Sequence, residues 1–295
     1  MNTTFYSNIP RLLSYDTGRF QMIPKEHFGL DQQAPTAVFN TSFNLKNAME
    51  YARHDYKYFK ECYADSKRDA RYGPADICDA TQQTQWPPPE VPHNLTLVHE
   101  SLAGILKAWS EFSEQQELTW WIQHGALLGW FWNSKLLPWD LDLDIGVPTR
   151  DLLQLLEFNN TLLEGRFLID ISPNVVIRSH QDENSIDGRV VDIDTGFFMD
   201  IAGISHISDN IPRFLCKNLH EYSHEDLVPL HETILEGIRV WRPKAAVRFL
   251  VEEYSEYSVI RDDFRLTATE VYKFNHDSRE WKHTLFDNRG HPIKQ

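Results

Sequence analysis

Hydrophobic residues recur at helical spacing in one long segment of the chain. They stand three or four positions apart, as on one face of an α-helix, and predict an amphipathic helix from about Leu95 to Gln116. The apolar positions of this segment are Val98, Leu102, Ile105, Leu106, Trp109 and Phe112. Just before it, three adjacent prolines in Trp86-Pro87-Pro88-Pro89 exclude a helix and mark a boundary.

Shorter apolar runs after this helix predict strands and brief helices. A tight turn and short helix are expected over His124–Trp130, and Thr149 is expected to cap a further helix. Asp194-Thr195-Gly196 is typical of a hairpin turn. Pro243 is expected to open a helix that runs to Tyr254. Strands are expected at residues 119–122, 167–171, 189–193, 196–201 and, after a turn, 235–240. No sustained period appears before residue 85 or beyond residue 256.

Three aspartates alternate with apolar residues in the run Pro138-Trp139-Asp140-Leu141-Asp142-Leu143-Asp144-Ile145. If this run is a strand, Asp140, Asp142 and Asp144 share one face, and the apolar residues fill the other. Three neighbouring carboxylates repel one another unless a cation lies among them or water screens them. Oxygen ligands favour Mg²⁺ or Mn²⁺, so the pattern predicts a metal site. The alternative is the solvated face of an edge strand.

The composition of the chain argues against some classes of function but does not identify one. The formal charge of −14 argues against broad nucleic-acid binding, which needs a basic surface. The three cysteines have no zinc-site spacing, and Cys62 with Cys78 is the one disulfide we would expect. Sequons begin at Asn2, Asn40, Asn94 and Asn159. No apolar run is long enough to span a bilayer and the start lacks a signal-peptide pattern, so no membrane anchor is visible.

A later acidic strand completes the expected constellation. An acidic strand that follows a glycine-containing turn, with another acid on a later strand, is the arrangement of the nucleotidyltransferase fold. The later acid is expected to be Asp200, with Asp192 as the competing candidate. The predicted fold class is therefore α+β, a nucleotidyltransferase-like mixed sheet with flanking helices.

These motifs resemble those of the LicD family. The similarity lies in Trp121–Asn133, which contains His124-Gly125-Ala126-Leu127-Leu128-Gly129, and in Leu137–Asp144. It continues through Arg189–Ile201 and Cys216-Lys217-Asn218. The family includes bacterial phosphocholine transferases, fukutin and fukutin-related protein, and the fungal branch of mannan mannosylphosphorylation is the most similar.

The resemblance implies transfer of a phosphorylated group, of mannose phosphate or phosphocholine type, from a nucleotide diphosphate donor to a glycan hydroxyl. Asp142 and Asp144 would bind Mg²⁺ or Mn²⁺ with support from Asp140, and Asp200 would hold a second metal or accept a proton. The residues that would bind the donor are His124, Gly125, Gly129, Arg189 and Lys217. His124 has a purely structural alternative, and Arg189 and Lys217 have one as ordinary surface charges. The implied location is the secretory pathway, at the Golgi.

Two other functions fit the same motifs. One is a non-catalytic regulator of a partner transferase on the same scaffold. The other is a glycosyltransferase that uses Asp-x-Asp to hold a nucleotide sugar and passes on the sugar without its phosphate. The expected organisation is an irregular N-terminal arm over residues 1–92, a LicD-like domain over 93–260 and a C-terminal tail over 261–295.

Overall fold

The computed structural model describes residues 15–29, 62–63, 70–71, 95–172, 175, 186–192, 194–195, 197–208, 211–287 and 289–293. Cys78, the proline-rich boundary and the sequons at Asn2, Asn40 and Asn94 lie outside these residues, as does most of the predicted arm.

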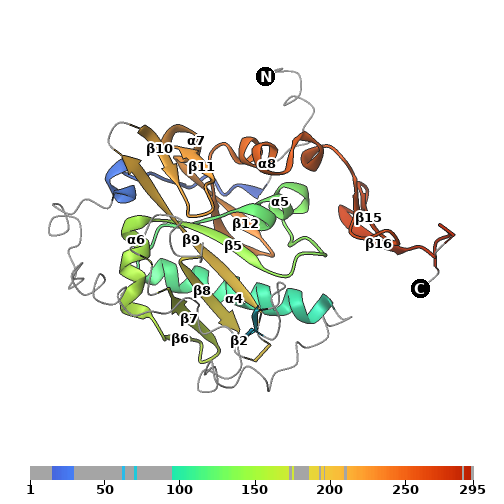
Figure 1. Ribbon diagram of the computed structural model, residues 1–295, viewed down its shortest axis with the longest axis horizontal. Helices are drawn as coiled ribbons and strands as arrows, with labels where there is room; N and C mark the ends of the chain where they lie inside the picture. Colours follow the sequence, from blue (N-terminus) through green and yellow to red (C-terminus); the bar gives the residue numbers. More distant parts are fainter. Residues whose placement is uncertain are drawn as a thin grey trace.

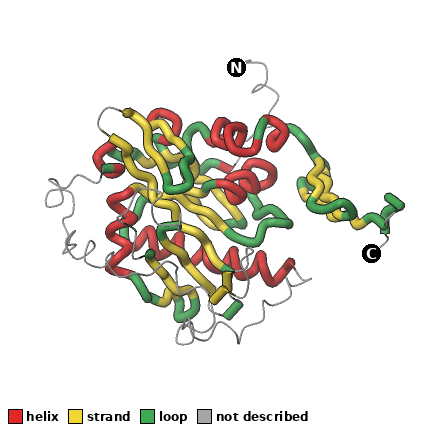
Figure 2. Tube along the Cα trace, viewed as in Figure 1, coloured by secondary structure: helices red, strands yellow, loops and turns green. Residues whose placement is uncertain are grey.

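A mixed sheet of eight strands forms the centre of the protein (Figures 1 and 2). Its long strand β9 pairs with β8 and with β10, both antiparallel, and also with β5, in parallel. The expected mixed sheet is confirmed. Its strands are β4 (Trp121–Ile122), β5 (Leu143–Pro148), β6 (Leu162–Leu163), β7 (Phe167–Ile171), β8 (Gly188–Asp192), β9 (Phe198–Ser208), β10 (Ile211–Leu215) and β11 (Glu221–Ser223).

Helix α4 (Leu95–Gln115) covers one face of this sheet, where it contacts β8 and β9 (Figure 1). The apolar positions that predicted this helix face the core: Val98, Leu102, Ile105, Leu106 and Trp109 are all fully buried. Each such side chain contributes about 1.5–3 kcal/mol through removal of apolar surface from water. The hydrophobic period therefore predicts both the helix and the face that it buries.

Short helices connect the strands. They are α5 (His124–Asn133), α6 (Thr149–Gln154), α7 (His224–Leu227) and α8 (Ala246–Tyr254), with 3-10 turns η2 (Lys25–Phe28), η4 (Leu155–Phe158) and η5 (Glu256–Val259). Thr149 does not cap α6, because the cap position is Pro148 and the Thr149 hydroxyl contacts the carbonyl of Ile204 at 2.9 Å. Helix α8 begins three residues later than the proline predicts.

A smaller sheet joins the described N-terminal residues to the second half of the chain. Strand β1 (Phe20–Gln21) pairs with β12 (Leu230–Leu235), which forms a hairpin with β13 (Ile238–Arg242). Glu236 and Gly237 both have positive φ at its turn, as a two-residue turn that matches the strand twist requires. Part of the expected arm is thus built into the domain.

The C-terminal residues form a sheet that the sequence pattern does not predict. Strands β14 (Asp263–Arg265), β15 (Glu270–Asn275) and β16 (Glu280–Leu285) pair in order, all antiparallel. Figure 1 shows this sheet at one end of the molecule. The two-residue strands β2 (Cys62–Tyr63) and β3 (Ala70–Arg71) pair with each other.

Candidate active site

The three alternating aspartates occupy the entry to β5 rather than a single strand face. Asp144 is the second residue of β5, while Asp140 and Asp142 precede the strand. The amide of Asp140 donates to the carbonyl of Leu137 at 3.0 Å, which closes a turn at Pro138-Trp139. The expectation of one continuous acidic strand is therefore wrong for Asp140 and Asp142. The turn, rather than a shared strand face, brings Asp140 and Asp142 to the same cavity as Asp144.

The start of α5 packs directly against these acids. A Cβ atom at Gly125 would lie 1.9 Å from Oδ2 of Asp140, so only glycine leaves room for that carboxylate. The amide of Gln123 donates to the carbonyl of Asp144 at 2.9 Å. Gly129 has a different role: a Cβ there would lie 2.2 Å from the backbone oxygen of Lys135. Gly125 thus shapes the acidic site, and Gly129 allows the following loop to approach the helix.

Burial and mutual repulsion dominate the electrostatics of the acids. Burial, followed by the charge of Asp142 and a hydrogen bond with it, raises the pKa of Asp140 to about 7. Burial also raises the pKa of Asp142, with a contribution from the charge of Asp200. Burial raises the pKa of Asp144 well above its usual value, although the neighbouring His124 opposes this. Several negative charges in one place are costly, and a bound cation would relieve that cost.

All three aspartates line one cavity of about 620 Å³. Gly125, Arg261 and Arg265 also line this cavity. Trp139 stacks on Phe264 with ring centroids 4.3 Å apart, so β14 is packed against the acidic turn. The aromatic residues that line the cavity are Trp132, Trp139, Tyr254, Tyr257, Phe264 and Trp281. Carboxylates, guanidinium groups and aromatic rings thus face one space.

Most of these wall residues were missed in the sequence because they lie beyond residue 256, where the chain has no clear period. The only signal there was its richness in aromatic and charged side chains. The tryptophans of the motif divide between core and cavity. Trp120, Trp121 and Trp130 are buried, whereas Trp132 and Trp139 line the cavity.

Asp200 lies beside the acids, but its carboxylate is engaged by Arg189. The parallel register aligns Asp200 with Asp144 on neighbouring strands. Nε of Arg189 donates to one oxygen of Asp200, and the Arg189 NH2 group donates to the other at 3.3 Å. Both residues are buried. Asp200 and Arg189 therefore form a buried ion pair, and their predicted roles stay predictions.

Two other sequence candidates, Lys217 and Asp192, also lie in ion pairs. Nζ of Lys217 is 3.2 Å from Oδ1 of Asp187, and both side chains are almost fully buried. Asp192 accepts hydrogen bonds from Arg166 at 2.8 and 2.6 Å. Burial alone would raise the pKa of Asp192, but the bonds from Arg166 and Ser101 outweigh it and lower the pKa. Neither Lys217 nor Asp192 lines the acidic cavity.

His124 begins α5 with a backbone φ of +47°. Its Nδ1 lies 2.5 Å from Oε1 of Glu253, and its ring centroid lies 4.8 Å from that of His220. Burial tends to lower the pKa of His124, but the hydrogen bond with Glu253 and the charges of Asp144, Glu253 and Asp142 outweigh it and raise the pKa. Nothing in the sequence predicts that His124 contacts His220 and Glu253, because these residues lie 96 and 129 positions further along the chain.

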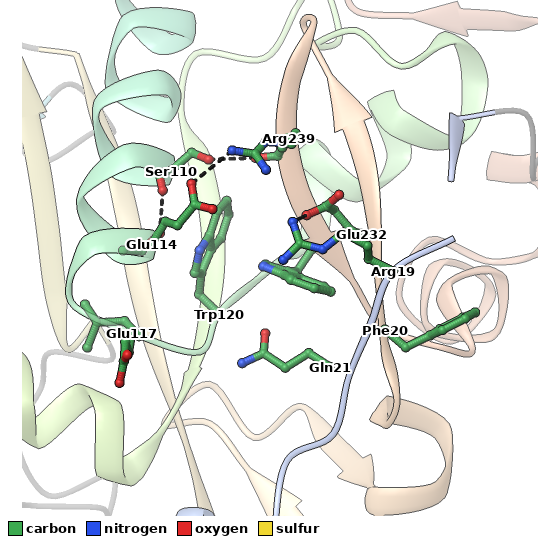
Figure 3. Close-up of a pocket in the computed structure, with 12 residues that line it drawn as sticks. Arg19, Phe20, Gln21, Ser110, Glu114, Glu117, Trp120, Glu232 and Arg239 are labelled. Carbon is green, nitrogen blue, oxygen red and sulfur yellow. Dashed lines mark hydrogen bonds and ion pairs between the residues drawn. The ribbon is translucent and has the colours of Figure 1, made fainter. Parts of the chain in front are cut away.

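Another cavity, of about 300 Å³, lies between α4 and the β12–β13 hairpin (Figure 3). Four of its charged side chains form two ion pairs: Nη1 of Arg19 is 2.7 Å from Glu232, and Nη2 of Arg239 is 3.0 Å from Glu114. It therefore lacks the concentration of uncompensated acids that distinguishes the cavity at Asp140, Asp142 and Asp144.

A mixed sheet whose acidic entry loop packs against a glycine at the start of a short helix defines a nucleotidyltransferase-type domain. Residues 117–245 match the family model described as LicD/FKTN/FKRP, nucleotidyltransferase domain. This segment of the chain is therefore a LicD-type domain, and the resemblance seen in its motifs is confirmed.

Two yeast proteins are similar to the same part of the chain. Mannosyltransferase regulator 14 of Saccharomyces cerevisiae is 33% identical over 131 residues, which are 41% of this chain and 14% of that protein. Mannosyltransferase regulator 4 of the same organism is 29% identical over 134 residues, which are 42% of this chain and 11% of that protein. The similarity thus spans only a small part of each relative.

Among the described residues, no helix combines the length and the apolar composition needed to cross a membrane.

Proposed function

We propose that the acidic cavity is the active site of a metal-dependent phosphotransferase. It would move a phosphorylated group from a nucleotide diphosphate donor to a glycan hydroxyl. The observation that carries this proposal is the convergence of Asp140, Asp142 and Asp144 on one cavity beside Gly125. The LicD match places these acids in a nucleotidyltransferase domain and supports the same reading.

The residues of the cavity fit Mg²⁺ or Mn²⁺. The donor set consists of carboxylate oxygens, which these hard cations prefer. The space that a Cβ at position 125 would fill lets Asp140 approach the other acids. Asp142 and Asp144 would hold the ion, and Asp140 would support them. When bound, such an ion neutralises charge on a diphosphate and on the departing nucleotide.

The wall of the cavity suits the remainder of the two substrates. Arg265 and Arg261, the latter also paired with Asp263, offer guanidinium groups that match phosphate oxygens. Aromatic faces such as those of Tyr257 and Trp132 suit sugar and base rings. In the transfer, the acceptor oxygen forms a bond to the phosphorus of the moving group. The bond from that phosphorus to the diphosphate bridging oxygen breaks, and nucleoside monophosphate leaves. A cavity carboxylate takes the acceptor's proton.

Mannose phosphate is the first candidate for the moving group, with phosphocholine second. The names of the two yeast relatives, both mannosyltransferase regulators, support a connection with mannose chemistry. With a glycan as the acceptor, we infer that the protein would act in the secretory pathway, at the Golgi. The matched segment is a small part of each relative, so the moving group and the cellular location are proposed for this chain and are not taken over from those proteins.

The test is a donor screen with Mn²⁺ across nucleotide-linked mannose and choline, followed by release of nucleoside monophosphate and by phosphorus content of the glycan. Asp142→Asn and Asp144→Asn are expected to lower turnover by a factor on the order of 10³. Their fold should persist, since neutralisation removes repulsion. Asp194→Asn is the matched control, because Asp194 is an exposed acid outside the cavity. Undiminished turnover in both cavity variants would rule out the proposal.

A second candidate function is regulation of a partner transferase without turnover. The printed names of both yeast relatives favour it, since each is called a regulator. The same screen separates the two functions. Tight, Mn²⁺-dependent binding of a nucleotide diphosphate with no turnover on any acceptor indicates the regulator, whereas phosphorus transferred to the glycan indicates the enzyme.

A further inference from the structure

A second group of metal-ligating side chains lies on the other side of the α5 start. His124, His220 and Glu253 each offer one ligand atom, and these three atoms lie within 4.8 Å of one another. His124 comes from α5, His220 from the loop between β10 and β11, and Glu253 from α8. The three residues line a cavity of about 300 Å³ that is separate from the acidic cavity. Three distant segments thus bring imidazole and carboxylate groups to one place.

Each histidine of this group is held in position by its own backbone or neighbours. His124 has left-handed backbone geometry, which costs a residue with a side chain on the order of 1–3 kcal/mol and is concentrated at functional sites. Nδ1 of His220 lies 3.4 Å from Sγ of Cys216, and the amide of Cys216 donates to the carbonyl of His220 at 3.3 Å. The two imidazole rings are therefore fixed close together, and their side chains are mostly shielded from water.

We propose that His124, His220 and Glu253 bind a Zn²⁺ ion. Two imidazole nitrogens and one carboxylate oxygen form a donor set typical of zinc, whereas the all-oxygen set of the acidic cavity suits Mg²⁺ or Mn²⁺. Zinc bonds to nitrogen are about 2.0–2.1 Å long, so tetrahedral ligands lie about 3.4 Å apart. Side-chain rotations would have to bring the ligand atoms from separations of up to 4.8 Å to this spacing. The ion replaces the proton shared by His124 and Glu253, which widens that pair beyond 2.5 Å.

The ion would act on the acidic cavity through the backbone. It would tie α8 and the β10–β11 loop to the first residue of α5, and the next residue is Gly125, which abuts Asp140. His220 does not line the acidic cavity, so its role in turnover would be positional. The proposal concerns a different site from the acidic cavity, and each can fail without the other.

The test uses the full chain, freed of metal with a chelator and then titrated with Zn²⁺ alone. We expect one Zn²⁺ per chain by elemental analysis. The melting temperature should rise by about 5 °C when Zn²⁺ exceeds its dissociation constant a hundredfold. Co²⁺, used as a spectroscopic substitute, should give visible absorption of a site with imidazole ligands. An absent Co²⁺ spectrum in the wild-type chain, with no shift in melting temperature, means a plain ion pair between His124 and Glu253 and overturns the proposal.

Variants identify the ligands. His220→Gln should weaken Zn²⁺ binding at least tenfold and abolish the Co²⁺ spectrum. His231→Gln is the matched control, because His231 also lies near a carboxylate, 3.8 Å from Asp16, but is not one of the three grouped residues. Asp142→Asn should leave the Co²⁺ spectrum intact. If His220→Gln and His231→Gln bind Zn²⁺ as the wild type does, the assignment is wrong. The wild-type spectrum decides the matter if His220→Gln does not fold.

Discussion

Gly125→Ala separates the stability of α5 from the function of the acidic cavity. The added methyl group would lie 1.9 Å from Oδ2 of Asp140 and 2.9 Å from its Cγ. An oxygen and a methyl carbon need about 3.3 Å, so the carboxylate must move by more than 1 Å. Alanine is favoured over glycine in a helix by at most about 1 kcal/mol. We therefore expect unchanged or slightly raised stability. A displacement of this size at a reacting centre lowers turnover about a hundredfold.

The assay pairs thermal unfolding with metal-dependent turnover or nucleotide diphosphate binding. Gly104→Ala is the matched control: it lies within α4, and its added Cβ would meet only the Phe167 ring, at 3.0 Å. Gly125→Ala should melt close to the wild type, Gly104→Ala should melt close to it or lower because the Phe167 ring is buried, and only Gly125→Ala should lose function. Full activity in Gly125→Ala would show that the position of Asp140 beside the helix start is not used. Loss of fold in Gly125→Ala alone would show that Asp140 cannot move aside.

Three further outcomes follow from buried charge and from the aromatic wall. Burial raises the pKa of Asp151 to about 6, above its usual 3.8. Between about pH 4 and pH 6 the folded state therefore holds a proton on Asp151 that the unfolded state lacks. The free energy of unfolding falls as the pH rises through this range. Asp151→Asn should be up to about 3 kcal/mol more stable than the wild type at pH 7, with no gain below pH 4, in urea unfolding. Arg189→Ala should lower the free energy of unfolding by about 3–5 kcal/mol because it strands Asp200; intact stability with weakened donor binding would instead support the predicted phosphate contact. Phe264→Ala should raise the KM for donor or acceptor about threefold to tenfold with little change in melting temperature, because Phe264 is 36% exposed and stacks on Trp139. An unchanged KM would place both substrates away from that wall.

The sequence predicts the elements whose signals are local. The period of Val98 to Phe112 identifies α4 because one stripe of that helix faces the core. The Glu236-Gly237 turn is predictable because its two residues must adopt positive φ, which glycine allows. The acids are found as a group for a chemical reason, since carboxylates so close together need compensation. Their geometry is not found: Pro138-Trp139 forms a turn, and alternation alone cannot distinguish a turn from a strand.

The features that escaped prediction depend on contacts between distant segments. The stretch after residue 256 carries no clear period, although it pairs into β14–β16 and packs through Phe264 on Trp139. The ion pair between Arg189 and Asp200 becomes visible only when the sheet register sets the two residues opposite each other. His220 and Glu253 can be identified as candidate metal ligands only after the fold has brought them close to His124. Tertiary packing, rather than local preference, determines these positions.

The most direct measurement is calorimetric titration of a nucleoside diphosphate into the wild-type chain and into Asp142→Asn, each with and without Mn²⁺. The wild type should bind only when Mn²⁺ is present, and Asp142→Asn should bind at least a hundredfold more weakly, because it lacks a carboxylate that holds the cation against the diphosphate. Equal affinity in both proteins, or binding by the wild type that ignores Mn²⁺, would contradict the assignment of the cavity at Asp140, Asp142 and Asp144.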